Sequence, residues 1–392
     1  MGRQAEAAIR LFVADTNSGG GVETGGRQYE LALECFDDCS RRDRAAEIYR
    51  SLCFDKRADL MFGPYSSGLT RVAEPIAEEA QMVLVNHGGA DDDPSSRPRR
   101  LTVGVLTPAD EYMTAMVRLL TTLKFWRKRV AVISSRSPFS RAVADGIERA
   151  CAERRVRRRG VRIRLKFTGA FDPERTPEML GRALRRNRIN VLLSAGSYSH
   201  DVAIMRMAVA PHFNIPVLGC VAAGVAQFCD DLGGDADGIV GPSQWEESVE
   251  VSPEIGPSPA EFVRRIRTVY RGSVDYPAAQ IYAAGLVTAA ALRSADSVDQ
   301  ERLRRAFSDL RTTTFFGDFA IDPISGRQIG HRMVLVQWHG GRKVIIAPEG
   351  AGDSGALELP SGWRLILGSL QWIRLKRRNE ESDEQDASDE EG

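Results

Sequence analysis

Small and hydroxyl residues gather at three places in the sequence, each directly after a short apolar run. These places are residues 63–70, residues 86–91 and residues 195–201. Backbone N–H groups and serine hydroxyls at the start of a helix suit a carboxylate, an amide carbonyl or another small polar anion. Ligands of open α/β sheets bind at the carboxyl ends of the strands, which is where such runs fall. Together, the three runs predict a cleft for a small polar molecule.

Residues of catalytic type also occur, but their spacing does not support catalysis. Ser199, His200 and Asp201 have the residue types of a hydrolase triad. Adjacent residues cannot point at one another as a nucleophile, a base and its orienting acid must. The sequence also lacks the G-x-S-x-G turn that carries the nucleophile in one large hydrolase class. We therefore predict that the protein is not an enzyme.

Motifs for a metal or a phosphate are incomplete. The glycines of residues 19–26 are followed by no Gly-Lys-Ser/Thr sequence and preceded by no strand, so they indicate a helix end and a turn. The acidic triplet at residues 91–93 lacks the spacing and the glycine of a calcium loop. No cofactor and no metal are therefore predicted. The six cysteines best fit small buried residues, and the alternative is a single disulfide among Cys35, Cys39 and Cys53.

The most basic stretch of the chain covers residues 154–166, with eight basic residues in thirteen positions. Nucleic-acid binding would use such a charge, but no aromatic residues are interleaved with it. Instead, Val161, Ile163 and Leu165 alternate with basic residues. This pattern favours a half-buried strand with a basic outer face, and no nucleic-acid partner is predicted.

The composition is that of an ordinary folded protein of 392 residues, with 43% hydrophobic and 27% charged residues. A net charge of zero hides two unlike parts, because residues 376–392 carry three basic and eight acidic side chains, which leaves +5 on residues 1–375. No apolar run approaches the roughly 18 residues that span a bilayer, and no secretory signal is seen at the start. As written, the chain is predicted to be cytoplasmic; a truncated N-terminus would make it periplasmic.

Strand-like and helix-like segments alternate from residue 5 to about residue 340. Single helices between strands imply right-handed crossovers, and hence parallel sheets with helices on both faces. The clearest strands are predicted at residues 59–62, 82–85, 129–134, 161–167, 190–194 and 216–219. The helices between and around them are predicted at residues 42–53, 70–80, 140–153, 176–186 and 201–209.

The start of the chain departs from this pattern. A doubly wound lobe normally opens with a buried strand, whereas residues 5–16 have apolar residues at helical spacing. The first strand is therefore predicted to be missing, or the chain to be truncated. Residues 29–33 alternate as a strand does and are predicted to form one.

Several of these segments resemble the type I periplasmic binding proteins, in the branch of the leucine/isoleucine/valine and amide-binding receptors of ABC transporters. The similarity is carried, in order and spacing, by residues 59–67, 75–78, 86–90, 313–322 and 336–338. It implies an α/β fold of two doubly wound parallel-sheet lobes, joined by three hinge crossovers and closing on a small ligand. The implied division gives lobe one residues 1–122 and 247–328, lobe two residues 123–246 and 329–350, and a disordered acidic tail residues 351–392.

The resemblance also implies ligand-binding positions. Ser67 falls at the lobe-one serine, and Gly88 falls where backbone groups meet the ligand. Phe139 falls at an aromatic cleft position and Tyr198 at the lobe-two tyrosine. Ala90 replaces the usual threonine and so removes a hydroxyl that would hold an amino-acid head group. The further candidates are neighbours of these positions or residues expected to face the cleft, namely Tyr65, Ser66, Gly89, Asp201, Val221, Trp245 and Glu246.

One departure from the family bears on the ligand. The acidic residue that pairs with the α-ammonium group in branched-chain amino-acid receptors should lie near Val221, where residues 221–223 carry no charge. A buried ammonium group without a carboxylate partner costs several kcal/mol. Either Asp201 or Glu246 takes over that role, or the ligand is an amide, a urea-like molecule or another small polar compound.

Two functions are therefore predicted. The first is a solute-binding protein that delivers an amino acid, an amide or a urea-like ligand to the permease of an ABC-type uptake system. The alternative is a cytoplasmic ligand-sensing regulator, similar to the amide-responsive regulator of amidase operons, whose partner is another protein. The two functions differ in whether the protein is exported.

Overall fold

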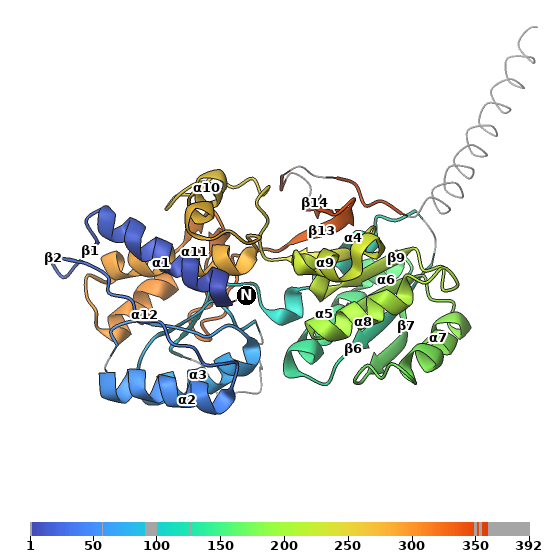
Figure 1. The fold of residues 1–392 in the computed structure, drawn as a ribbon, viewed down its shortest axis with the longest axis horizontal. Coiled ribbons are helices and arrows are strands. Elements are labelled where there is room, and N and C mark those ends of the chain that lie inside the picture. Colours follow the sequence, from blue (N-terminus) through green and yellow to red (C-terminus); the bar gives the residue numbers. More distant parts are fainter. Residues whose placement is uncertain are drawn as a thin grey trace, which may run out of the picture.

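The structure is a computed structural model that describes residues 2–56, 58–90, 100–124, 127–348, 351–352 and 355–359. Its helices and strands form two α/β lobes, which lie beside each other in Figure 1. The expected fold class of two lobes with parallel sheets is confirmed. The expected acidic end of the tail lies outside the described residues.

Lobe one is built around a short parallel sheet in the order β3 (Met61–Phe62), β4 (Leu84–Asn86) and β5 (Thr102–Gly104). Two antiparallel hairpins belong to it, β1 (Val22–Thr24) with β2 (Arg27–Tyr29) and β11 (Thr312–Thr314) with β12 (Gly317–Phe319). Its helices are α1 (Gly2–Ser18), α2 (Arg42–Arg50), α3 (Ser67–Glu79), α10 (Pro259–Val269), α11 (Tyr276–Ala295) and α12 (Gln300–Asp309).

The core of lobe one forms where α1 crosses α11. The helix α11 is rich in alanine and buried along most of its length, so neighbouring backbones approach it closely. At Gly285 a Cβ atom would lie 2.5 Å from the ring of Phe12, which only glycine avoids. Rings of Phe262, Tyr282 and Phe315 complete this core.

Lobe two contains a seven-stranded sheet in the order β14-β13-β10-β9-β8-β6-β7. Its parallel strands are β6 (Lys128–Ser134), β7 (Val161–Thr168), β8 (Val191–Ala195), β9 (Val217–Cys220) and β10 (Val240–Ser243). Two antiparallel strands extend one edge, β13 (Val334–His339) and β14 (Arg342–Ala347). Its helices are α4 (Thr114–Leu120), α5 (Pro138–Ala152), α6 (Arg154–Arg158), α7 (Thr176–Arg186), α8 (Tyr198–Ala208) and α9 (Gln227–Leu232).

Helices cover both faces of the lobe-two sheet, as the sequence predicts. In β6, Val130 and Val132 pack in the cluster that contains α4 and α5. The alternate residues Ala131 and Ile133 pack in the cluster that contains α7 and α8. A strand buried on both faces has no polar side to alternate with, which explains its continuous apolar sequence. The predicted basic-faced strand at residues 161–167 is β7, an edge strand with an exposed alternate face.

Two expectations are wrong. Residues 29–33 do not form a strand, because β2 ends at Tyr29 and residues 30–38 follow without regular structure. A strand exists only with a partner, and none lies beside this segment among the described residues. The expected end of the first lobe-one part at residue 122 is also too late, because Met113, Met116 and Leu120 of α4 pack in the lobe-two core. The first crossing between the lobes therefore lies near Thr107.

The three segments that cross between the lobes are hydrogen-bonded to one another. The Thr107 N–H donates to Oε1 of Gln244 at 3.1 Å, and Nε2 of Gln244 donates to the Thr107 carbonyl at 3.1 Å. The Thr107 hydroxyl lies 2.6 Å from Nδ1 of His331, whose Nε2 lies 3.1 Å from the Phe316 carbonyl. A carbonyl only accepts, so Nε2 of His331 carries the proton and Nδ1 accepts from the hydroxyl. The crossings thus form one bonded hinge.

Two buried histidines predict how stability depends on pH. Burial lowers the pKa of both His87 and His331 to about 4, whereas an unfolded histidine has a pKa of about 6.5. The unfolded chain takes up protons below pH 6.5 while the folded protein does not, so stability is complete above that pH and falls toward pH 4. We expect a loss approaching about 1.4 kcal/mol per pH unit for each histidine, measured by urea unfolding at several pH values.

Two matched variants distinguish the contribution of His331 to the pH dependence of stability from the contributions of other groups. His331→Gln should flatten the pH dependence, since one of the two depressed histidines is gone. The exposed His212 provides the control, and His212→Gln should leave the slope as it is. A wild-type protein equally stable at neutral pH and at about pH 5 would contradict the burial of these two rings.

Candidate functional site

The loop between β3 and α3 carries Tyr65, Ser66 and Ser67, three of the predicted residues. Ser66 has a φ of +132°, which residues other than glycine rarely adopt, and such strain gathers at functional sites. Its carbonyl accepts from the N–H groups of Leu69 and Thr70 at 3.2 and 3.0 Å, while its side chain is exposed. Ser67 is the first residue of α3 and is half-buried. The loop therefore presents a hydroxyl beside the start of a helix.

The loop after β4 presses against this first loop. A Cβ atom at Gly88 would lie 2.5 Å from the carbonyl oxygen of Pro64, so only glycine allows the approach. Oδ1 of Asn86 accepts from the N–H groups of Gly88 and Gly89 at 3.2 and 2.8 Å, and its Nδ2 donates to the Gly89 carbonyl at 2.7 Å. These N–H groups are thus engaged within the loop. Ala90 is buried and packs in the cluster of α4 and α5.

Tyrosines of both lobes lie near the hinge, close enough to interact electrostatically. The hydroxyls of Tyr65 and Tyr276 lie 2.9 Å apart. Across the boundary, Tyr112 of lobe two accepts from Nε2 of Gln244 at 3.1 Å and packs edge-on against Phe139 at 5.4 Å between ring centroids. Burial raises the pKa of all three tyrosines, and the proximity of Tyr65 and Tyr112 raises the pKa of Tyr276 further. The three hydroxyls therefore stay protonated and act as neutral hydrogen-bonding groups.

Tyr198 and Val221 follow neighbouring parallel strands of lobe two. Tyr198 is the first residue of α8, after β8, and Val221 comes directly after β9. Both side chains are half-buried. The Tyr198 hydroxyl donates to Oδ2 of Asp231, and burial, followed by this carboxylate, raises the pKa of Tyr198. In the described part of the chain neither residue is hydrogen-bonded to lobe one.

Asp201 is fully buried, and its carboxylate already accepts three hydrogen bonds. Oδ1 accepts from the Ser194 hydroxyl at 2.7 Å and from the Gly196 N–H at 2.7 Å, and Oδ2 accepts from the Ala222 N–H at 3.1 Å. These bonds join the loop after β8 to the turn after β9. Asp201 therefore braces the cleft edge of lobe two instead of presenting a charge to a ligand.

Glu246 belongs to a buried cluster with Lys343 and Asp275. Nζ of Lys343 donates to Glu246 at 2.7 Å and to Asp275 at 3.2 Å, and Asp275 also accepts from the Ala226 N–H at 3.2 Å. Burial alone would lower the pKa of Lys343, but the two carboxylates outweigh it and raise the value. Because Asp275 precedes α11 of lobe one and Lys343 lies on β14 of lobe two, this charged cluster ties the lobes together.

Trp245 is expected to line the cleft, and the structure places it in the core of lobe one instead. The side chain is 2% exposed, and its Nε1–H donates to the Phe315 carbonyl at 3.0 Å. Its ring packs edge-on against Phe262 and Phe315 at 5.7 and 6.0 Å. Trp245 thus anchors the second crossing segment, next to Gln244, in the lobe-one core.

Comparison with known proteins decides the family. A family model described as periplasmic binding protein matches residues 1–343. The chain belongs to the periplasmic binding protein family. This confirms the resemblance inferred from the sequence, including the fold of two lobes.

Solved structures of similar fold include proteins of ABC transport systems. A putative branched-chain amino acid ABC transporter protein from Rhodospirillum rubrum has a TM-score of 0.67 and 21% identity, over 88% of this chain and 95% of that chain. A substrate-binding protein from Desulfitobacterium hafniense in complex with Leu has a TM-score of 0.71 and 18% identity, over 87% and 95%. An R. palustris solute-binding protein in complex with benzoate has a TM-score of 0.69 and 17% identity, over 90% and 94%. At these identities the likeness shows the shared fold.

Several structural features of the binding protein bear on the remaining predictions. Among the described residues, no three His, Cys, Asp or Glu side chains gather as a metal site requires, and residues 91–93 lie outside the described part. All six cysteines are free thiols, so the alternative of a disulfide is wrong. No helix of the described part is long and apolar enough to span a membrane.

Four residues of the binding protein lie at the lobe boundary although their positions in the sequence did not predict it. These are Tyr112, Tyr276, Asp275 and Lys343. Two of them carry a signal in the sequence. Asp275 precedes Tyr276 and a proline at a helix start, a typical capping position. Lys343 is one of six lysines in a chain with 47 arginines. A lysine at this position is therefore unusual for a chain in which most basic residues are arginine.

The bracing role of Asp201 predicts a loss of stability on substitution. In Asp201→Asn an amide nitrogen would face an N–H or O–H donor, which should lower the free energy of unfolding by about 1–3 kcal/mol. Urea denaturation measures this, with Asp230→Asn on the exposed surface of α9 as the control. A fully stable Asp201→Asn protein that no longer binds its ligand would contradict the bracing role.

The charged cluster predicts a change in the shape of the binding protein. Asp275→Asn removes the charge that draws Lys343 of lobe two toward lobe one, so the lobes should separate more often. Small-angle X-ray scattering without added ligand should then give a larger radius of gyration than wild type. Asp235→Asn, on the exposed surface of lobe two, should leave it unchanged. An identical radius in wild type and Asp275→Asn would show that the hinge alone sets the lobe angle.

Proposed function

We propose that the protein captures a small polar ligand between its lobes outside the cytoplasm and delivers it to the permease of an ABC-type uptake system. The observation that carries this proposal is the bonded hinge of Thr107, Gln244 and His331, which joins two lobes whose strand ends bear hydroxyl and aromatic residues. Hinged lobes close around ligands and exclude water from the hydrogen bonds that hold them. The family and the substrate-binding relatives support the same function.

We infer further that the ligand carries no ammonium group. An ammonium would need a carboxylate partner in the closed cleft. Of the two candidates, Asp201 is fully buried and holds three donors of its own lobe, and Glu246 is paired with Lys343. A neutral amide or urea-like molecule needs no charged partner, and the tyrosine and serine hydroxyls at the lobe boundary can form its hydrogen bonds. The complex of the R. palustris relative with benzoate is an example in this fold of a ligand without an ammonium group.

A panel of small compounds tests the ligand class. Thermal-shift measurements with acetamide, benzamide, phenylurea and L-leucine should show stabilisation by the amides or the urea. A ligand at one hundred times its dissociation constant stabilises the folded protein by about 2.7 kcal/mol, which is easily measured. Stabilisation by L-leucine, with no response to any amide or urea, would contradict the proposed ligand class.

Two variants test the cleft itself. Ser67→Ala and Tyr198→Ala should each weaken binding of the best compound by about 1–3 kcal/mol, the cost of an unmet polar partner. Isothermal titration calorimetry gives the affinities. Ser252→Ala, on an exposed segment between the lobes, is the control. Unchanged affinity in both cleft variants would place the ligand elsewhere.

A further inference from the structure

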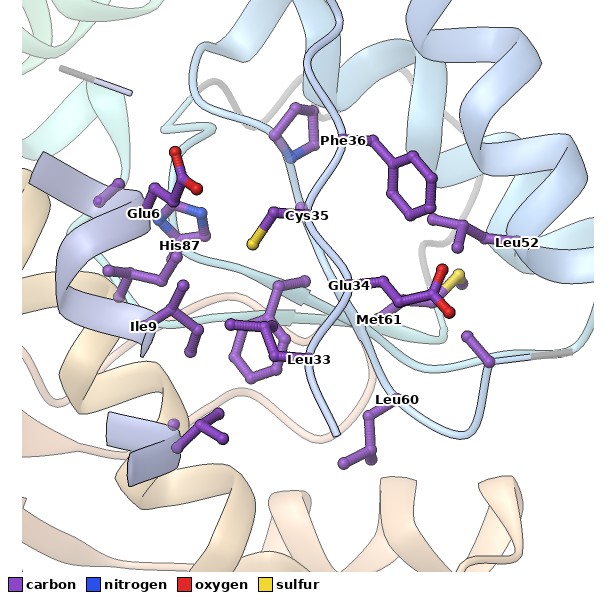
Figure 2. Close-up of a pocket in the computed structure, with 18 of the residues that line it drawn as sticks. Glu6, Ile9, Leu33, Glu34, Cys35, Phe36, Leu52, Leu60, Met61 and His87 are labelled. Atoms are coloured by element: carbon purple, nitrogen blue, oxygen red, sulfur yellow. The ribbon is translucent and has the colours of Figure 1, made fainter. Parts of the chain in front are cut away.

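Positive and negative charge gather in different parts of the molecule, and the proposed function uses neither accumulation. A cavity of about 1460 Å³ lies in lobe one between α1, β3 and residues 30–38, and Figure 2 shows apolar side chains such as Ile9 and Met61 around it. Six acidic and two basic residues also line this cavity, and Figure 2 labels Glu6 and Glu34 among them. Negative charge therefore prevails around the cavity.

Positive charge gathers at one edge of lobe two, where β6, β7 and β8 begin. These strands are parallel neighbours in the order β8-β6-β7, so the segments that lead into them lie at the same edge. Nine arginines lie within six residues of the three strand starts, and most of their side chains are exposed. We call these arginines the basic face, namely Arg127, Arg129, Arg157, Arg158, Arg159, Arg162, Arg185, Arg186 and Arg188.

Hydrogen bonds join the segments that carry the basic face. Nζ of Lys128 donates to the Arg159 carbonyl at 3.1 Å. Nδ2 of Asn190 donates to the Arg127 carbonyl at 2.7 Å, and its Oδ1 accepts from the Arg129 N–H at 2.7 Å. Burial, followed by the charge of Arg159, lowers the pKa of Lys128, as expected where positive charges are crowded. The backbone of the basic face is therefore fixed, and its charges lie close together.

The arginines of the basic face lack the acidic partners that other surface arginines have. On helices of lobe one, Arg10, Arg264 and Arg305 each pair with a glutamate three or four positions away. None of the nine arginines forms an ion pair with a carboxylate in the part of the chain that the structure describes. Crowded charges of one sign create a field that attracts a polyanion. The basic face is therefore a binding surface for a partner with many carboxylates or phosphates.

The same chain contains a segment of matching charge. Residues 379–392 have eight acidic residues and no basic residue, and they lie outside the described residues. Carboxylates accept charge-assisted hydrogen bonds from guanidinium groups, frequently two at a time. Eight carboxylates thus face nine guanidinium groups, which is close to a balance of charge.

The described chain leads toward the edge that carries the basic face. The Glu358 N–H donates to Oε1 of Gln337 at 2.8 Å, and Nε2 of Gln337 donates to the Glu358 carbonyl at 2.8 Å. Gln337 pairs with Val240, the first residue of β10, and β10 is parallel to β9 and so to β8 and β6. Three strand spacings, about 14 Å, separate β10 from β6. The 19 residues between Leu359 and Asn379 can span at most about 65 Å, so the acidic segment reaches the basic face.

We propose that residues 379–391 bind the basic face of lobe two, so that the chain covers this surface with its own acidic segment. A tether gives the segment an effective concentration in the millimolar range, which a lipid surface or a free polyanion would have to exceed. The basic face lies where β6, β7 and β8 begin, whereas the predicted cleft residues Tyr198 and Val221 follow the ends of β8 and β9. The bound segment therefore leaves the ligand cleft open.

A competing peptide tests whether the segment occupies the basic face. A fluorescein-labelled peptide of residues 379–391 is titrated, at about 20 mM NaCl, with wild type and with a full-length variant whose eight acidic residues in this segment are Asn or Gln. Fluorescence anisotropy should show that the neutralised variant binds the peptide at least tenfold more tightly, because no acidic segment covers its basic face. At about 300 mM NaCl this binding should be lost through screening. Equal affinity of both proteins at low salt would overturn the proposal.

Substitutions within the neutralised variant locate the binding surface. Replacing four arginines of the basic face should weaken peptide binding at least tenfold, namely Arg157→Gln, Arg158→Gln, Arg185→Gln and Arg186→Gln. The matched control removes the same charge from exposed arginines of lobe one and should change the affinity less than twofold, namely Arg27→Gln, Arg271→Gln, Arg293→Gln and Arg302→Gln. Equal losses in both sets would overturn the proposal, because total charge would then explain the binding.

A second measurement needs no substitution in the folded lobes. Small-angle X-ray scattering should give wild type a larger radius of gyration at about 300 mM than at about 20 mM NaCl, since salt releases the segment. The neutralised variant should show no such change, and a constant radius in wild type would overturn the proposal. So would phosphatidylglycerol vesicles that bind wild type as tightly as the neutralised variant at low salt, because the basic face would then be open to lipid in wild type.

Discussion

The hydrogen bonds among Thr107, Gln244 and His331 decide how the two lobes face each other, and the cleft depends on them. Each crossing segment contributes hydrogen-bonding groups of its backbone or of one polar side chain to a buried junction. A shift of any segment would therefore leave a buried donor or acceptor without a hydrogen bond. Trp245 fixes the second segment in the lobe-one core. The pairing of Lys343 with Asp275 adds a tie at a distance from the hinge. Hinge and tie together join lobe one, which carries Tyr65 and Tyr276, to lobe two, which carries Tyr112 and Phe139.

The same arrangement explains why the cleft offers hydroxyls but few charges. A carboxylate is a binding group only when its lone pairs are open to the ligand. Asp201 is buried and already accepts from three donors, and Glu246 accepts from the ammonium group of Lys343. What remains at the lobe boundary are tyrosine and serine hydroxyls, which both donate and accept. Such groups match a neutral amide better than an amino acid.

Much of lobe two could be predicted from the sequence, because strands such as β6 and β8 are buried on both faces and read as short apolar runs between helices. Residues 29–33 also alternate apolar and polar side chains. A strand needs a second strand to pair with, however, and the sequence of one segment does not show whether a partner lies beside it. Trp245 is aromatic, as cleft residues often are, but it lies in the core because it packs against the rings of Phe262 and Phe315. These residues come later in the chain, so the sequence around Trp245 does not reveal the contact. Asp275 and Lys343 lie 68 positions apart, so no local spacing reveals that they meet.

A crystal structure of the protein with the amide or urea that stabilises it most would show directly where the ligand binds. We expect the compound to lie between the loop of Tyr65 to Ser67 and the side chains of Phe139 and Tyr198, held by hydroxyls, with Asp201 and Glu246 keeping their present partners. A ligand bound outside the boundary of the two lobes would contradict a cleft between them. So would a ligand amine that takes Asp201 or Glu246 from its partners.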